Sequence, residues 1–304
     1  MLVQQLTYLS ALARERHFGR AADACHVTQP TLSAGLRRLE EELGVPLVRR
    51  GRRYEGLTAE GERILAWAHR LLADVEGLRA DVRVMRDGLV GRLRIGAIPT
   101  SLPIVSLLTA PLLRAHPDLD LAVQSMTSRQ IEEGLRDARL DVGLTYLDNE
   151  PLVGVRTRRL YEERYLYLVQ RDGPHAGAAE VGWAEVAGER LCLLSPDMQH
   201  RRILDAVFRA ARAQPRPMLE TNSITTLYAH VRDGLAAGVM PHTWLHLFGL
   251  PEGVRAIPLR DPLVRHAIGV VWPDRDPEPL LARAFVDSVR DVRVEEEVSA
   301  PARA

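Results

Sequence analysis

The chain has 304 residues, of which 46% are hydrophobic and 26% are charged, and its 40 basic and 40 acidic side chains give a formal net charge of zero. Single hydrophobic cores stop growing at about 250 to 300 residues, so we expect more than one domain, and the apolar content excludes a disordered chain. Any nucleic-acid contact must come from a local basic patch, and every basic residue is arginine because the sequence contains no lysine.

The sequence has two cysteines, Cys25 and Cys192, which excludes a disulfide framework and a four-cysteine zinc site. No basic segment precedes an apolar core at the N-terminus, and no stretch reaches the roughly 20 apolar residues of a membrane span. We therefore expect a cytoplasmic protein without a membrane partner, and we expect neither a cofactor nor a metal.

The first 57 residues have the pattern of short helices. Leucines share one face of a first helix, and small residues mark a second; these are Leu2, Leu6, Leu9 and Leu12, then Ala21, Ala22 and Cys25. A third helix is predicted to begin after Thr28, a good N-cap, and to end at Leu43, because Gly44 supplies the stop.

A much longer helix is predicted from Thr58 to Gly88, with Glu60 and Glu62 in its first turn. At about 1.5 Å per residue it would be roughly 45 Å long. Its apolar stripe is too long to bury against the small N-terminal unit, so it predicts a linker helix that packs against a second chain.

After Gly91 the pattern changes to short apolar runs that alternate with helical segments. This alternation predicts an α/β region with largely parallel sheets. The expected strands are 93–97, 119–124, 142–146, 165–169, 191–194, 238–241 and 267–272, and the expected helices are 102–115, 128–138, 200–212, 224–236 and 279–291.

Residues 17–53 have the pattern of a helix, a tight turn and a second helix with polar residues at its leading end. Such an end can enter the major groove and meet base edges and phosphates, and Gln29 is the best-suited base reader. The candidate DNA-binding residues on this helix are Thr28, Gln29, Pro30, Thr31, Ser33 and Arg37.

Four arginines follow within five residues, in the run Arg49-Arg50-Gly51-Arg52-Arg53, and residues 54–57 can complete a hairpin wing. An isolated arginine cluster is more often a solvated turn. Here the cluster follows a helix-turn-helix pattern and precedes a dimer-type helix, which favours a wing whose Arg50, Arg52 and Arg53 contact the DNA backbone.

These motifs resemble those of LysR-type transcriptional regulators. The resemblance is carried by Ala21-Ala22, Val27-Thr28-Gln29-Pro30-Thr31-Leu32-Ser33, Leu39-Glu40-Glu41-Glu42-Leu43-Gly44-Val45-Pro46-Leu47, Leu57-Thr58 and Gly61. Val48 replaces the usual phenylalanine, and Ala34-Gly35 replace a longer polar or basic pair, which puts base contacts from those two positions in doubt.

The resemblance covers nearly the whole chain and implies the fold class and domains. It implies an N-terminal winged helix-turn-helix at 1–58, a linker and dimerisation helix at 59–90, and an effector-binding domain at 91–300. The effector domain would have the periplasmic-binding-protein-like fold of two α/β subdomains, one at about 91–162 and 267–300 and the other at about 163–266, joined by crossover strands. Expected partners are double-stranded promoter DNA, a small-molecule effector, further copies of the chain in a dimer or tetramer, and RNA polymerase.

In this family the effector binds between the subdomains, beside strand ends and helix N-termini. Loops in that position offer hydroxyls and backbone N–H groups, which suit a small carboxylate. The candidate effector-binding residues are Pro99, Thr100, Ser101, Thr127, Ser128, Gln199, His200, Arg202 and Ser223. Thr100 and Ser101 are expected to cap the next helix. Taken singly, each Ser or Thr is more often a plain N-cap, and either Arg201 or Arg202 could face the cleft.

The segment Gly143–Pro151 is similar to LysR-type regulators encoded near formate dehydrogenase genes, which makes formate one candidate effector. A peroxide sensor of this family would need two thiols in the effector domain, where only Cys192 is found. His242 and His246 have helical spacing but lack a third ligand, so ordinary histidines are favoured over a metal site.

The sequence contains no recognisable catalytic constellation, so we expect a regulator and not an enzyme. The alternative is a small-molecule binding protein without a sequence-specific DNA function. That alternative leaves the helix-turn-helix and the long helix without a role.

Overall fold

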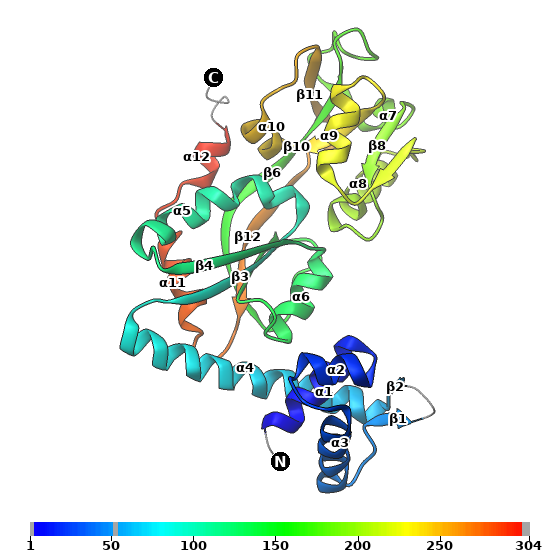
Figure 1. The fold of residues 1–304 in the computed structure, drawn as a ribbon. Coiled ribbons are helices and arrows are strands. Elements are labelled where there is room, and N and C mark those ends of the chain that lie inside the picture. The colour runs from blue at the N-terminus through cyan, green and yellow to red at the C-terminus, as the bar shows by residue number, and fades with distance from the viewer. Residues whose placement is uncertain (1–2, 51–53, 300–304) are drawn as a thin grey trace. The chain divides into compact units, whose positions relative to one another are not determined.

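The computed structural model describes residues 3–50 and 54–299 (Figure 1). The chain divides into an N-terminal unit, which runs up to Gly88 and includes Arg136–Arg139, and a larger unit that contains the remaining residues. No helix in the described part of the chain is long and apolar enough to cross a membrane.

The N-terminal unit begins with α1 (Val3–Glu15), α2 (Phe18–Ala24) and α3 (Gln29–Leu43). Leu32, Leu36 and Leu39 recur at helical spacing on α3 and are fully buried, and burying each such side chain stabilises the unit by about 1.5 to 3 kcal/mol. Thr28 caps α3 by accepting a hydrogen bond from Thr31 N, and Gly44 ends the helix in the left-handed conformation, as predicted.

A small wing follows, in which β1 (Val48–Arg50) pairs antiparallel with β2 (Tyr54–Leu57). Glu40 of α3 accepts hydrogen bonds from Leu47 N and Val48 N, which fixes the start of the wing to the helix. The predicted long helix is confirmed as α4 (Ala59–Asp87), which Thr58 caps.

The larger unit contains a mixed sheet with the strand order β4-β3-β5-β12-β6-β10-β8-β9, and β11 also pairs with β6 and with β7. Its first part comprises β3 (Gly91–Ala97), the 3-10 helix η1 (Pro99–Ile104), α5 (Val105–Ala115), β4 (Leu119–Ser125), α6 (Ser128–Arg136) and β5 (Val142–Tyr146). Its second part comprises β7 (Val181–Gly182), α7 (Trp183–Val186), β8 (Leu191–Leu194), α8 (Gln199–Ala210), β9 (Leu219–Thr221), α9 (Ile224–Arg232), β10 (Ala237–Pro241), α10 (His242–Phe248) and β11 (Val254–Arg260).

Two strands connect the two parts, and the chain then ends in two short helices. β6 (Val155–Gln170) pairs with β12 along its first half and with β10 and β11 along its second half (Figure 1). β12 (Arg265–Pro273) also pairs with β5, and α11 (Leu280–Ser288) and α12 (Val294–Ser299) follow it. One continuous strand therefore runs through both halves of the larger unit.

The expectation of largely parallel sheets was only partly correct. β3 is parallel to β4 and to β5, and β8 is parallel to β9 and to β10, but the pairings of β6 with β10, β11 and β12 are antiparallel. Only residues 165–169 were predicted to be a strand, whereas β6 has 16 residues. Its first half lacks an apolar run, because Arg156, Arg158 and Arg159 lie there on a stretch that is exposed or half-buried.

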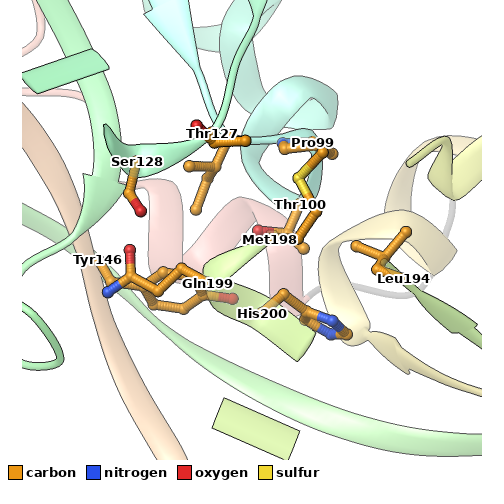
Figure 2. A pocket seen from close by; sticks show the side chains of 10 residues that line it. Pro99, Thr100, Thr127, Ser128, Tyr146, Leu194, Met198, Gln199 and His200 are labelled. Carbon is orange, nitrogen blue, oxygen red and sulfur yellow. The ribbon is translucent and has the colours of Figure 1, made fainter. Parts of the chain in front are cut away.

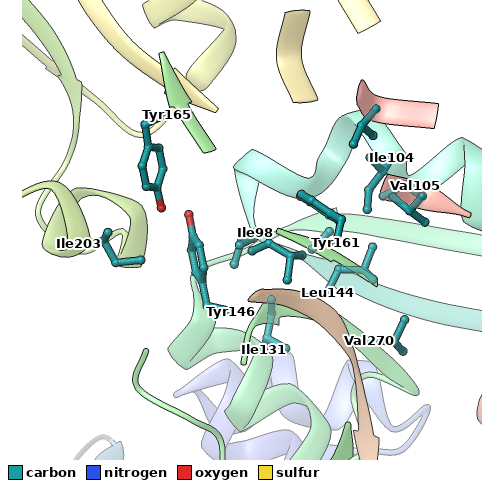
Figure 3. Close-up of a cluster of buried hydrophobic side chains, with 14 of the residues drawn as sticks. Ile98, Ile104, Val105, Ile131, Leu144, Tyr146, Tyr161, Tyr165, Ile203 and Val270 are labelled. Atoms are coloured by element: carbon teal, nitrogen blue, oxygen red, sulfur yellow. The ribbon is translucent and has the colours of Figure 1, made fainter. Parts of the chain in front are cut away.

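Buried apolar side chains from both parts form one core cluster, of which Figure 3 shows Ile98, Leu144 and Val270. A second cluster lies under α9 and includes Cys192 and Leu227. The N-terminal unit has its own core around Leu9, Leu12 and Leu36. Each unit therefore has the apolar interior that an independent domain requires.

Candidate functional site

The leading end of α3 is exposed as a candidate DNA-reading surface. Gln29, Pro30 and Thr31 are exposed, Ser33 is half-buried, and Arg37 is exposed one turn further along the helix. The hydroxyls of Thr28 and Thr31 lie 2.8 Å apart in a hydrogen bond, so part of their polar capacity is used in capping. The amide of Gln29 is thus presented to solvent at the position where a recognition helix meets base edges.

Two of the three departures from the expected motif, Ala34 and Gly35, lie on the same helix. A Cβ at Gly35 would come within 2.7 Å of the Tyr8 ring, so this residue faces α1 and only glycine permits that approach. Gly35 therefore packs inside the unit, which explains why it offers no side chain to DNA, whereas Ala34 is exposed.

The arginines of the wing are only partly described. Arg49 donates from Nε to Leu57 O at 2.8 Å, which holds the two wing strands together, and the backbone of Arg50 is in β1. Arg52 and Arg53, both predicted to contact DNA, lie outside the described residues. Thr58 joins the wing to α4 by donating to Pro46 O at 2.6 Å.

A small cavity in the larger unit lies where strand ends meet, between the two parts joined by β6 and β12 (Figure 2). The carboxyl ends of β3, β4, β5 and β8 lead into it, the position at which open α/β sheets bind ligands. Its volume is about 10 Å³, room for about one water molecule. It is lined by Ile98, Pro99, Thr100, Thr127, Ser128, Tyr146, Leu194, Met198, Gln199 and His200.

Six of the nine predicted effector residues line this cavity: Pro99, Thr100, Thr127, Ser128, Gln199 and His200. Helices α6 and α8 begin at Ser128 and Gln199, so the positive ends of two helix dipoles face it. Thr127 and Gln130 form a capping box, because each side chain accepts a hydrogen bond from the other's backbone N–H.

Several buried polar atoms around the cavity find no hydrogen-bond partner among the described residues: Thr100 Oγ1, Ser128 Oγ, Gln199 Oε1 and both ring nitrogens of His200. Leaving such a group unpaired costs about 1 to 3 kcal/mol, so these atoms are available to a bound polar molecule. Gln199 is held in place because its Nε2 donates to the backbone carbonyl of Asn149.

His200 contributes to the cavity as a neutral ring. Burial, together with nearby His266, lowers its pKa to about 3. The ring packs edge-on against Tyr165, with 5.5 Å between the centroids. At neutral pH it offers one N–H donor and one acceptor and carries no charge.

Three predicted effector residues do not line the cavity. Ser101 lies inside η1 and donates to Ile98 O, and neither it nor Thr100 caps that helix, whose N-cap Ile98 makes no side-chain cap bond. Arg202 pairs with both carboxylate oxygens of Glu150 and donates to Asp197 O, so its charge is already matched. Ser223 caps α9 by accepting from Thr226 N.

Arg201, the other arginine considered for the cleft, is also engaged elsewhere. It pairs with Asp205 at 2.8 Å and with Glu220 at 2.6 Å, and it donates to Leu194 O. The lining of the cavity therefore contains no arginine, and the side chains that reach it are neutral hydroxyl, amide, imidazole and apolar groups.

Four lining residues were not among the predicted effector residues: Ile98, Tyr146, Leu194 and Met198. Tyr146 is the last residue of β5, so the rule that ligands bind beyond the carboxyl ends of strands could have identified it. Its hydroxyl donates to Oε1 of buried Glu163 at 2.5 Å. The hydroxyl of Thr243 in α10 donates to Thr100 O at 3.3 Å, so α10, which was not predicted, braces this loop.

Comparisons with known proteins agree with this geometry. Residues 3–62 match the family model of the bacterial regulatory helix-turn-helix protein, lysR family, and residues 86–293 match the model of the LysR substrate binding domain. The chain is 31% identical over 294 residues to a hydrogen peroxide-inducible genes activator of Dickeya chrysanthemi, with 96% of this chain and 95% of that protein covered. It is 32% identical over 284 residues to the DNA-binding transcriptional dual regulator OxyR of Escherichia coli, with 93% and 92% covered.

Two solved structures show the same architecture along their whole length. A full-length OxyR variant from Pseudomonas aeruginosa is 29% identical and superposes with a TM-score of 0.74, covering 97% of this chain and 99% of that one. Full-length CbnR in complex with its target DNA is 23% identical, with a TM-score of 0.66 and coverage of 95% and 99%, and shows the likeness of fold. This chain therefore shares its order of elements, from the helix-turn-helix to the mixed α/β unit, with these two proteins.

Proposed function

This chain belongs to the LysR family of transcriptional regulators, and from that premise we propose that it binds promoter DNA as a dimer or tetramer under the control of a small carboxylate. The observation that supports the effector site is the small cavity whose lining has unpaired, buried polar atoms and two helix N-termini. The proposal includes the domain boundaries: the DNA-binding domain ends near residue 58, and the linker helix ends near residue 90.

For DNA, we assign base reading to the exposed leading end of α3 and backbone contacts to the wing. Gln29 is the base reader, with Thr28, Pro30, Thr31, Ser33 and Arg37 around it. Arg50, Arg52 and Arg53 contribute phosphate contacts, which give a chain of zero net charge the local positive charge it needs. RNA polymerase is the expected partner at the promoter.

Self-association is assigned to α4. Apolar side chains along this helix are exposed, including Leu78 at 65%, Val82 at 54% and Met85 at 81%. A row of this kind at helical spacing is stabilised when a second apolar helix covers it. Two copies then place two recognition helices on the half-sites of a pseudo-palindrome.

For the effector, we propose a small carboxylate such as formate, bound by Thr100, Thr127, Ser128, Gln199 and His200. The cavity of about 10 Å³ has room for about one water molecule, so an acid enters only if the lining residues move apart, and the smallest acids require the least movement. Hydroxyl and N–H donors and the two helix N-termini suit an anion. Binding here, between the two parts of the larger unit, would change the angle between them and so the DNA contacts.

The relatives named as peroxide-inducible activators suggest a second signal, but the thiols of this chain do not favour it. Cys192 is fully buried in β8, and burial raises its pKa to about 11. Burial also raises the pKa of Cys25, which is in the N-terminal unit. Because the thiolate is the reactive form, neither cysteine is poised for oxidation.

DNA footprinting tests this proposal. The purified chain is footprinted on the intergenic DNA beside its own gene, alone, with formate, with a panel of small carboxylates, and with hydrogen peroxide. We expect a specific footprint whose length changes with one of the acids and not with peroxide. A footprint that responds only to peroxide would show that the signal is peroxide and not a carboxylate. The absence of specific binding at low salt would contradict the proposal that the chain binds promoter DNA.

A further inference from the structure

A buried carboxyl group lies directly beneath the cavity. Glu163 is on β6 and has no exposed surface, and its neighbours Thr100 and Tyr146 both line the cavity. Its Oε1 accepts the hydrogen bond from Tyr146. The hydroxyls of Thr100 and Tyr165 also lie near the carboxyl group and lower its pKa, but neither forms a hydrogen bond of ordinary geometry with Oε2. Figure 3 shows the hydroxyls of Tyr146 and Tyr165, both neighbours of Glu163, pointing toward one another.

No positively charged side chain is among the groups that shift the pKa of Glu163. The titratable groups that face it or adjoin its partners are Tyr146, Asp148, Tyr161, Arg164, Tyr165, His200, His242, His246, His266 and Glu295. His200 is neutral because burial lowers its pKa to about 3, and burial likewise lowers the pKa of His242 to about 4. His266 lies against Asp148, at 3.1 Å between Nδ1 and Oδ1.

We propose that Glu163 acts on the effector site from behind its lining, and that a carboxylate effector binds together with one proton, which Glu163 holds on its carboxyl group next to the lining residues Thr100 and Tyr146. This inference rests on the proposed function, because it takes the carboxylate class as given. It adds a residue that controls effector binding without lining the cavity. It also fixes the protonation state in which the complex forms.

The chemistry follows from two carboxyl groups that share one buried site. Two ionised carboxylates repel strongly when they lie near one another in a buried medium of low dielectric, so one proton remains with the pair. No arginine lines the cavity to neutralise a second negative charge, since Arg201 and Arg202 pair with other carboxylates. The proton comes from solvent, and no covalent bond is made or broken.

In the ligand-free protein, the carboxyl group of Glu163 already favours its protonated form. Burial raises the pKa of Glu163 to about 7, against the opposing effect of the hydroxyls around it. Below that pH the carboxyl already carries its proton, and binding requires no uptake. Above it, each pH unit weakens binding about tenfold, because the proton must first be taken from solvent.

Calorimetric titration of the full-length chain with sodium formate and sodium acetate, in buffers of different ionisation enthalpy, counts the protons taken up. At about pH 8.5 we expect nearly one proton per effector bound, and at about pH 5.5 almost none. Glu163→Gln has an amide N–H in place of the acid proton, so its affinity should be independent of pH with no proton uptake. Glu162→Gln, on the neighbouring residue, should behave as the unsubstituted chain does.

A second variant keeps the test valid if Glu163→Gln folds poorly in a melting experiment. Tyr146→Phe removes the hydrogen bond that favours the ionised carboxylate, so the loss of affinity should begin at a higher pH. Formate binding with pH-independent affinity in the unsubstituted chain would overturn the role of Glu163 and leave the effector class intact. If no carboxylate binds at any pH while the DNA footprint is intact, the effector class is wrong and this inference fails with it.

Discussion

The junction between the wing and α4 depends on a glycine, and replacing it should destabilise the N-terminal unit. A Cβ at Gly61 would lie 2.0 Å from Leu47 O and 2.9 Å from Leu47 C. The carbonyl cannot move away freely, because it also accepts a hydrogen bond from Thr58 N at 3.0 Å. Overpacking costs about 1 to 3 kcal/mol, and the strained hydrogen bond adds about 1 kcal/mol, so Gly61→Ala should cost about 2 to 4 kcal/mol.

The same substitution elsewhere on the helix provides a matched control. A Cβ at Gly77 meets nothing within 4 Å, so Gly77→Ala should stabilise α4 by up to about 1 kcal/mol through helix propensity. Hydrogen exchange measured on peptides that cover the wing reports the local free energy of opening. Gly61→Ala should speed exchange there by about 30-fold to about 700-fold, and Gly77→Ala should not. Equal exchange in the two variants would refute the backbone contact at Leu47.

Four further predictions concern DNA, assembly and pH. Gln29→Ala should cost about 1 to 3 kcal/mol at the specific site and little on random DNA, and an equal loss on both in gel shifts would exclude base reading. Replacing Arg52 and Arg53 by alanine should reduce the salt dependence of binding by about two phosphate contacts, which an unchanged slope in a salt titration would contradict. Leu78→Glu should shift the chain toward monomer in sedimentation, and an unchanged distribution would remove α4 from the interface. The pKa of Glu163 is raised in the folded chain, so the free energy of unfolding falls as the pH rises from about 4.5 to about 7. Glu163→Gln should therefore raise the melting temperature above pH 7 but not near pH 4.5. Equal gains at both pH values would contradict the raised pKa.

The N-terminal unit could be predicted closely because local signals determine it. Thr28, Gly44 and Thr58 set helix ends through hydrogen bonds and backbone conformation that lie within a few residues. The leucine spacing of α3 similarly identifies its buried face. The role of Gly35 depended on the approach of α1, which no local pattern shows.

Six of the nine residues predicted for the effector site line the cavity, because residues after strand ends can be recognised, but which side chains face it depends on long-range contacts. Arg202 does not line the cavity, because it pairs with Glu150, which is 52 residues away in the loop that follows β5. Glu163 was missed because its neighbours along β6 are charged and exposed in part, so the sequence around it resembles a solvated strand. Its burial follows only from the pairing of β6 with β12 and the position of Tyr146.

The central claim is that a small carboxylate in the cavity controls the DNA contacts, and a footprint of one blocked variant tests it most directly. Ser128→Leu places an apolar side chain at the cavity of about 10 Å³, and Ser106→Leu places the same side chain on an exposed position of α5. We predict that both variants give the specific footprint, but that only Ser106→Leu changes its footprint when the effective acid is added. A Ser128→Leu footprint that still responds to the acid would contradict the account, because the signal would then enter at another site.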